Sequence, residues 1–425
     1  DGIRALYETI STTTNPKAQT FFQQWKILFN EVCGYDVNSP SEKIKKLGEF
    51  YGIYCTPLMD CRLSIDDCRL RGKETQSTIY NHQSSFERGI YGAPKPAELL
   101  FAVHTYYALF MKLLASEIVA FFHQLPTPLQ KMMQAGTSNK LRREMEELEA
   151  GSIFRHLNIT NFLEGDLFAW YPAAWCEPIE KLIRDMVAKL DGYNPGTLSE
   201  DPTGSRDLLK KLYQQLFPRS VRHDLGEYYT PDWLAEHVLN ELEYTGDPDK
   251  RLLDPACGSG TFLVMAINRI RKWYDDNRER CPYNEGDLCR KILQNIIGFD
   301  LNPLAVMAAR TNYLIAIRDL ISYMDRVEIP VYLCDSIMTP AEYGGLTAGR
   351  LGDVKELQTS AARFLIPTEI ATKRDDVAKY ANLLESCVRD SYSPEEFIVR
   401  CRDESLPVTA ETLHIDLYNE LVKLD

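Results

Sequence analysis

A glycine-rich loop and three aspartates carry the chemistry that this sequence could perform. The loop lies within Leu253–Leu263, LDPACGSGTFL, and Asp254 stands at its start. Asp300 and Asp335 occur later in the chain, each after an apolar run. A single aspartate in such a place is usually a turn or helix-capping residue, because its short side chain bonds to nearby backbone amides. Three in succession, one of them entering a glycine loop, indicate a ligand with several hydrogen-bond donors.

The loop residues discriminate among the ligands that glycine loops hold. A phosphate loop needs a lysine after its last glycine, and none follows Gly260. A dinucleotide loop needs a third glycine where Leu263 stands, and Asp254 would face the pyrophosphate with like charge. S-adenosylmethionine instead offers a sulfonium, an ammonium and ribose hydroxyls, which suit carboxylate neighbours. Gly258 and Gly260 would let the backbone approach its methionine part, and Thr261 would begin a helix whose amides face its carboxylate.

Alternating strand and helix patterns place these residues at one edge of a sheet. The segments are 251–256, 261–276, 295–302, 303–321 and 329–337, beginning and ending with a strand pattern. Such alternation is typical of a parallel sheet with right-handed crossovers, a doubly wound α/β fold. Ligands of that fold bind beyond the carboxyl ends of the strands. We therefore expect Asp254, Asp300 and Asp335 to close the three strands and to surround one site.

The rest of the chain divides by composition. With 425 residues it exceeds what one hydrophobic core usually serves, so more than one domain is expected. Residues 1–190 carry helical periodicity and form a predicted helical N-terminal domain. Residues 191–209, which begin with a stretch rich in Gly, Pro, Ser and Asp, form a predicted linker. Residues 210–340 form the α/β core, and residues 341–425 are a predicted helical insertion.

The most apolar window, Leu99–Phe122, raises the question of a membrane span. Its interior carries His104, Lys112 and Glu117. Charges near the centre of a bilayer are costly, so a buried helix is the better interpretation. We expect no membrane partner.

The cysteines and the net charge indicate whether the chain is expected to form disulfides, bind a metal or hold nucleic acid. Eleven cysteines without regular spacing do not predict a disulfide framework, and reduced thiols in a cytoplasm explain them. Cys55, Cys61 and Cys68 lie close together, but their spacing matches no familiar zinc site and the chain has no CxxC pair, so no metal is expected. The net charge of −13 argues weakly against a chain that holds nucleic acid by itself, since neutralising phosphates needs clustered Lys and Arg.

Four segments, in order, carry a family resemblance. LGEYYTPDWLAEHVL, DPACGSGTFL, GFDLNPLAVMAARTNYL and LCDSI resemble the cofactor half of N-6 adenine-specific DNA methyltransferases of restriction-modification and phage-defence systems, including type I and type IIG enzymes. The resemblance is specific over Arg222–Met338. It implies a Rossmann-like core that binds S-adenosylmethionine and serves an enzyme methylating the exocyclic amine of adenine. It also implies that the full-length protein has DNA as its partner, together with restriction or defence-system subunits.

The resemblance assigns roles to residues at the methionine end of the cofactor. Tyr229, Thr230 and Pro231 would contact that end. Asp254 and the glycine loop would surround the amino acid part of the cofactor. The loop residues are Ala256, Cys257, Gly258, Ser259, Gly260, Thr261 and Phe262.

Further roles concern the adenosine end. Asp300 would accept hydrogen bonds from the ribose hydroxyls, with Leu301 against the adenine. Asp335, followed by Ser336, would receive the exocyclic amine of the adenine. Cys257 lies in the cofactor loop without a neighbouring base, so it is not expected to act as a nucleophile.

The sequence lacks one motif of the family, the motif that holds the target amine. The family holds its target amine with Asn-Pro-Pro-aromatic, or with Asp in place of Asn, and stacks the ring on a flipped base. Neither NPP nor DPP occurs in this sequence; Asn302 begins NPL and Asn194 begins NPG. We interpret the chain, which begins Asp1-Gly2 without Met, as a fragment that stops before this motif, is inactive alone and has no catalytic residue of its own. A core acting on RNA or protein, or a non-catalytic cofactor-binding scaffold, stays open as an alternative.

Overall fold

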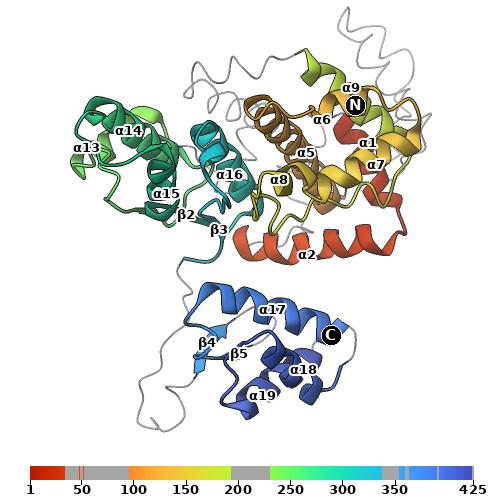
Figure 1. Cartoon of the computed structure of the whole chain (residues 1–425). Helices are drawn as coiled ribbons and strands as arrows, with labels where there is room; N and C mark the ends of the chain where they lie inside the picture. The colour runs from red at the N-terminus through yellow and green to blue at the C-terminus, as the bar shows by residue number, and fades with distance from the viewer. Residues whose placement is uncertain are drawn as a thin grey trace, which may run out of the picture. The chain divides into compact units, whose positions relative to one another are not determined.

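The computed structural model describes residues 1–33, 47, 51, 95–192, 230–336, 354–358, 363–389 and 392–423. They form two compact units, Asp1–Cys334 and Asp335–Asp425. Within the described residues, the first unit contains a helical part and a small parallel sheet, and the second contains a two-stranded hairpin with helices (Figure 1). Most of the predicted linker falls on 193–229, outside the described residues, so its boundaries stay predictions.

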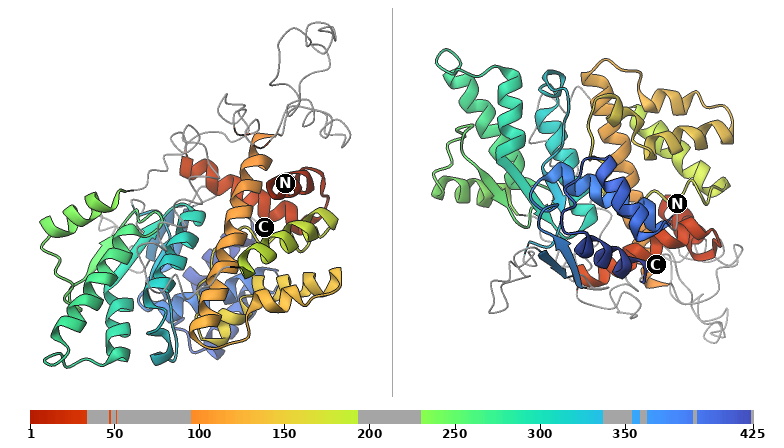
Figure 2. Two further views of the ribbon diagram at one scale, coloured as in Figure 1. Left: turned by 90° about the horizontal axis from the view of Figure 1, so that it is seen from above. Right: turned by 60° about the horizontal axis from the view of Figure 1, so that its bottom comes forward.

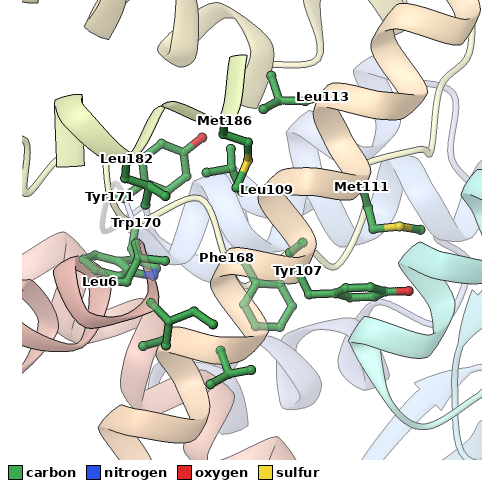
Figure 3. Close-up of a cluster of buried hydrophobic side chains, with 14 of the residues drawn as sticks. Leu6, Tyr107, Leu109, Met111, Leu113, Phe168, Trp170, Tyr171, Leu182 and Met186 are labelled. Carbon is green, nitrogen blue, oxygen red and sulfur yellow. The ribbon is translucent and has the colours of Figure 1, made fainter. Parts of the chain in front are cut away.

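The helical part of the first unit packs around one long apolar helix, α5 (Pro96–Phe122). Pro96 suits its first turn, because the N–H that proline lacks would have no partner within the helix. The other helices of this part are α1 (Gly2–Thr12), α2 (Pro16–Cys33), α6 (Pro128–Met133), α7 (Ser138–Glu149), α8 (Ser152–His156) and α9 (Glu177–Asp191). Side chains such as Leu6, Trp170 and Leu182 fill the space between α1, α5 and α9 (Figure 3). These helices agree with the helical periodicity of residues 1–190.

The charged side chains inside α5 are buried and have partners. Lys112 Nζ lies 2.6 Å from Glu149 Oε2 and 2.5 Å from Asp166 Oδ2. Glu117 Oε1 accepts the backbone N–H of Leu129 at 2.9 Å. Among the described residues α5 is the one helix long and apolar enough to cross a membrane, but 89% of its most apolar window is buried within the structure. In this fold α5 is therefore a core helix, as its internal charges predicted.

Three parallel strands form the sheet of the first unit, in the order β1-β2-β3. They are β1 (Leu252–Asp254), β2 (Ile296–Asp300) and β3 (Val331–Leu333). The helices of this region are α13 (Asp232–Glu241), α14 (Thr261–Asn277), α15 (Glu285–Asn295), α16 (Pro303–Ile317) and the short η2 (Ile321–Tyr323). The predicted strands, their parallel pairing and the crossover helices α14 and α16 are confirmed.

The third strand ends earlier than the sequence predicted. Asp254 and Asp300 are the last residues of β1 and β2, as expected, but β3 ends at Leu333 and not at Asp335. The neighbouring strand β2 ends at Asp300, and the N–H of Cys334 donates to its carbonyl at 3.0 Å. Beyond Cys334 the third strand has no length of β2 left to pair with, so Asp335 lies outside the sheet.

The helical part is joined to the sheet beside the segment that leads into β3. Ile159 forms a parallel bridge with Val327. The side-chain amide of Asn161 bonds both backbone groups of Ile329: its Nδ2 donates to the carbonyl at 2.8 Å and its Oδ1 accepts the N–H at 2.9 Å. Helix α16 packs along α5, as the views in Figure 2 show. The helices and the sheet of the first unit therefore share one packed structure.

Asn161→Ala is expected to lower the free energy of unfolding of the first unit by about 1 to 3 kcal/mol, because it leaves the buried N–H of Ile329 unpaired. The carbonyl of Ile329 loses one bond and still accepts the N–H of Val331 at 2.7 Å. Urea denaturation followed by circular dichroism measures this loss. Asn277→Ala is the matched control, since Asn277 Nδ2 donates to the Trp273 carbonyl within its own helix and is partly exposed. An equal loss in both variants would show that Asn161 does not join the two parts.

The second unit has a core of its own. Its elements are β4 (Val354–Gln358), β5 (Arg363–Pro367), α17 (Arg374–Arg389), α18 (Pro394–Asp403) and α19 (Glu411–Val422), with β4 and β5 antiparallel. Glu369 fixes the start of α19, because its carboxylate accepts the N–H groups of Thr409 and Ala410 and bonds His414 Nε2 at 2.8 Å. Helices α17, α18 and α19 agree with the predicted helical insertion, but residues 354–358 and 363–367 within it form a hairpin that was not predicted.

Candidate functional site

The glycine-rich loop joins the end of β1 to the start of α14. Asp254 Oδ1 accepts the N–H of Ala256 at 3.2 Å, which turns the chain directly after the strand. Gly258 has a φ of 53°, and Gly260, the N-cap residue of α14, has a φ of 83°. Both values lie in the left-handed region, where residues with a side chain are strained, so the turn itself requires these glycines. Among the described residues no atom lies within 4 Å of a Cβ placed on Gly258, and a ligand can approach the backbone there.

Asp300, at the end of β2, holds this loop from the neighbouring strand. Its Oδ2 accepts the N–H of Gly258 at 2.8 Å, and its Oδ1 accepts the N–H of Asn302 at the same distance. The N–H of Cys257 donates to the carbonyl of Phe299 at 2.8 Å. The structure thus brings Asp300 and the glycine loop together, as the sequence predicted.

A close contact beneath the loop depends on a glycine of β2 that is not among the predicted site residues. A Cβ on Gly298 in β2 would lie 2.6 Å from Leu263 Cδ1 and 3.0 Å from Cys257 Sγ. Side chains do not pack at such distances, so glycine at this position lets Cys257 and α14 lie directly on the strand. The signal in the sequence is a glycine within the apolar run IIGFD, a pattern that often marks the close approach of another segment.

Two carboxyl groups make the edge of the sheet electronegative. Burial raises the pKa of Asp254, and the nearby charge of Asp300 raises it further. The hydrogen bond from the Ala256 N–H acts in the opposite direction and is a weaker influence than burial. Burial also raises the pKa of Asp300, although the backbone amides of Asn302, Gly258 and Leu301 stabilise its ionised form. A cation beside the two carboxylates would offset both effects. The site therefore suits a positively charged ligand with hydrogen-bond donors.

Asp254→Asn is expected to raise the melting temperature of the ligand-free chain at pH 7. Because the pKa of Asp254 is higher in the folded chain than in the unfolded chain, ionisation above the folded pKa costs stability. That cost disappears as the pH falls toward the unfolded value of about 4. Thermal unfolding at both pH values measures the difference between variant and wild type. A variant that melts lower than wild type at pH 7 would contradict this account of Asp254.

Cys257 is expected to be an unreactive thiol. Burial and the charges of Asp300 and Asp254 raise its pKa well above the ordinary value, so little thiolate forms at pH 8. Iodoacetamide should alkylate Cys257 at least about tenfold more slowly in the folded chain than in urea, whereas the partly exposed Cys281 should react readily. Peptide mass spectrometry follows both residues in one sample. Rapid alkylation of Cys257 in the folded chain would reopen a nucleophilic role.

The other predicted site residues are placed less completely. Tyr229 lies outside the described residues, and Thr230 and Pro231 directly precede α13. Leu301 follows Asp300, and Thr261 and Phe262 form the first turn of α14. Asp335 and Ser336 belong to the second unit, and their place in the site stays a prediction. The described residues contain no group of His, Cys, Asp and Glu side chains that could hold a metal, and Cys55, Cys61 and Cys68 lie outside them.

Comparison with known proteins identifies the segment that carries this loop. The N-6 DNA Methylase family matches residues 204–331, which include β1, β2 and the glycine loop between them. We call residues 204–331, which match this family, the methylase domain. The matching family and the names of the relatives are those of methyltransferases that act in DNA methylation and restriction-modification.

The chain matches only part of the length of each of three curated relatives. "Adenine-specific methyltransferase PglX" of Streptomyces coelicolor is 29% identical over 203 residues, which is 44% of this chain and 16% of the relative. The type I restriction enzyme EcoEI methylase subunit of Escherichia coli is 25% identical over 156 residues, 36% of this chain and 26% of the relative. The MjaVII methylase subunit of Methanocaldococcus jannaschii is 25% identical over 154 residues, 36% of this chain and 22% of the relative. No solved structure matches the chain.

Proposed function

We propose that this chain binds S-adenosylmethionine at the glycine loop of a Rossmann-like core. The observation that carries the proposal is the bond from the Gly258 N–H to Asp300, which sets an open glycine backbone beside two carboxyl groups. The raised pKa values of Asp254 and Asp300 suit a cationic ligand. The amides at the start of α14 suit the carboxylate of its methionine part.

Different residues would hold different parts of the cofactor. Asp254 and the loop 256–262 would hold the amino acid part, with Tyr229, Thr230 and Pro231 at the same end. Asp300 accepts the backbone amides of Gly258, Asn302 and Leu301, and its carboxylate keeps acceptor capacity for a ribose hydroxyl. Leu301 would lie against the adenine, and Asp335 with Ser336 would receive its amine.

The reaction follows from the family of the methylase domain. When bound, the cofactor supplies an electrophilic methyl group. The residues of this chain would fix the direction of that methyl group by holding the ribose and the amino acid part, while charge at the carboxyl edge stabilises the ligand. We propose that the full-length enzyme transfers the methyl group to the exocyclic amine of adenine in DNA. The names of the relatives support a setting in restriction-modification or phage defence, with DNA and restriction subunits as partners. The proposed location is a cytoplasm, where the irregularly spaced cysteines would stay reduced.

Isothermal titration of the chain tests cofactor binding. S-adenosylmethionine and S-adenosylhomocysteine should both release heat and raise the melting temperature. ATP and NAD should do neither, because the loop offers carboxylates where those ligands carry phosphates. No heat and no thermal shift at millimolar S-adenosylhomocysteine would overturn the proposal.

A further inference from the structure

Helix α16 passes directly under the glycine loop and touches it at two positions one turn apart. A Cβ on Gly260 would lie 3.3 Å from the Cβ of Ala309 and 3.4 Å from its Cα, so the loop rests on the helix backbone. Three residues later, Asn312 Nδ2 donates to the carbonyl of Ser259 at 2.9 Å. Residues three apart on a helix lie on the same face, so one face of α16 supports the loop.

Asn312 is a buried side chain with only one of its two polar atoms bonded. It is 2% exposed, and its Oδ1 is buried without a hydrogen-bond partner among the described residues. An unpaired buried acceptor destabilises the fold, whereas an apolar side chain of the same shape would not. Stability alone therefore does not account for an amide at position 312, and its bond to the loop is the contact that remains to explain it.

Hydrogen bonds fix the orientation of two peptide groups of the loop. The N–H of the peptide group between them stays available to a ligand. The Cys257–Gly258 peptide is held because its carbonyl accepts the N–H of Gly260 at 2.8 Å and its N–H donates to Asp300. The Ser259–Gly260 peptide is held because its carbonyl accepts from Asn312 and its N–H bonds Cys257. Peptide groups are planar, so the orientation of each is set once both of its polar groups are bonded. Between them, the N–H of Ser259 donates to no other group in the described part of the chain.

We propose that Asn312 is a positioning residue of the cofactor site: with Asp300 it orients the glycine loop so that the Ser259 N–H is presented to the carboxylate of the bound ligand. This inference rests on the proposed function. Helix α16 would then determine how tightly the amino acid end of the cofactor is held. Asp300 and the residues after it would hold the adenosine end. The two ends of the ligand should therefore respond differently to a change at position 312.

Asn312→Leu tests the proposal, because leucine has nearly the shape of asparagine and removes both the donor and the unpaired acceptor. S-adenosylhomocysteine, which has the amino acid part, should bind about tenfold more weakly, the effect of one lost hydrogen bond at a fixed site. Methylthioadenosine, which lacks that part, should bind within about twofold of wild type. The melting temperature should stay the same or rise. Asn312→Ala gives a second measurement if the leucine variant does not fold.

Asn295→Leu is the matched control. Asn295 is 8% exposed and its Nδ2 donates to the carbonyl of Pro248 at 2.7 Å, but it lies where β2 begins, at the other end of that strand from Asp300. This variant should bind both ligands as wild type does. Equal weakening of both ligands by Asn312→Leu, together with a lower melting temperature, would show a merely structural role and overturn the proposal. Unchanged binding of S-adenosylhomocysteine would overturn it as well, while wild type that binds neither ligand would overturn the proposed function and this inference with it.

Discussion

Asp300→Ala is expected to lower the affinity of the chain for S-adenosylhomocysteine by about 5- to 150-fold, or about 1 to 3 kcal/mol. The substitution removes the acceptor proposed for the ribose hydroxyls. It also releases the N–H of Gly258, which Asp300 Oδ2 holds at 2.8 Å, so the glycine loop loses its tie to β2. Both effects act on the same ligand, which places the expected loss toward the upper end of this range. Isothermal titration with S-adenosylhomocysteine measures the change.

Two further variants separate the parts of this effect. Asp300→Asn keeps an oxygen that can accept from Gly258 and loses the charge, so it should fall between wild type and Asp300→Ala. Asp319→Ala removes a carboxylate of the same unit that pairs with Arg271 at 2.8 Å on the surface, and it should leave affinity unchanged. An Asp300→Ala variant that binds as tightly as wild type would show that the cofactor lies elsewhere.

The parts of this site that could be predicted are those where the ligand or the turn restricts the residue type. Gly258 and Gly260 have positive φ values, and Asp254 and Asp300 end neighbouring strands, so glycines and aspartates stand in the sequence where the chemistry needs them. Strand and helix periodicity then sufficed to place the ends of these strands at one edge of a parallel sheet. Residue types and periodicity are local properties, which is why the sequence reveals them.

The contacts that support the loop were not predictable in the same way. Asn312 looks like an ordinary helix residue, and Gly298 indicates a close approach without showing which segment approaches. Their roles arise when β2, α14 and α16 pack together. Arg310 is 2% exposed and bonds the carbonyls of Val331 and Glu164, although an arginine in a helix usually faces solvent. These roles depend on partners far away in the sequence.

Some secondary structure was missed for reasons of length and pattern. Helix α15 begins with a capping box, in which Asn284 Oδ1 accepts the N–H of Asp287 at 2.8 Å, and this local signal could have revealed it. The hairpin of β4 and β5 has strands of five residues each and is followed by helical patterns. Runs that short are ambiguous between helix and strand, because periodicity needs more residues to show itself.

Residues 1–425 alone are expected to transfer no methyl group to DNA, even with S-adenosylmethionine bound. Transfer requires the adenine amine to be held in line with the sulfonium, and holding reacting groups in place accounts for on the order of 7 to 11 kcal/mol of such a barrier. The family resemblance gives that task to Asn-Pro-Pro-aromatic, and the sequence contains neither NPP nor DPP. With a net charge of −13 the chain also has little to attract a duplex or to extrude a base from it. Incorporation of tritiated methyl groups into mixed-sequence DNA measures the transfer.

The comparison is the same chain lengthened at its C-terminus by a segment that carries Asn-Pro-Pro-aromatic, because the two share the glycine loop and differ in the group that holds the base. Methylation by the lengthened chain and none by residues 1–425 is the expected result. Methylation by residues 1–425 would contradict it, because side chains already present would then hold the adenine. A lengthened chain that binds the cofactor and leaves DNA unmethylated would favour a cofactor-binding scaffold, since the loop held by Asp300 and Asn312 would then serve binding without transfer.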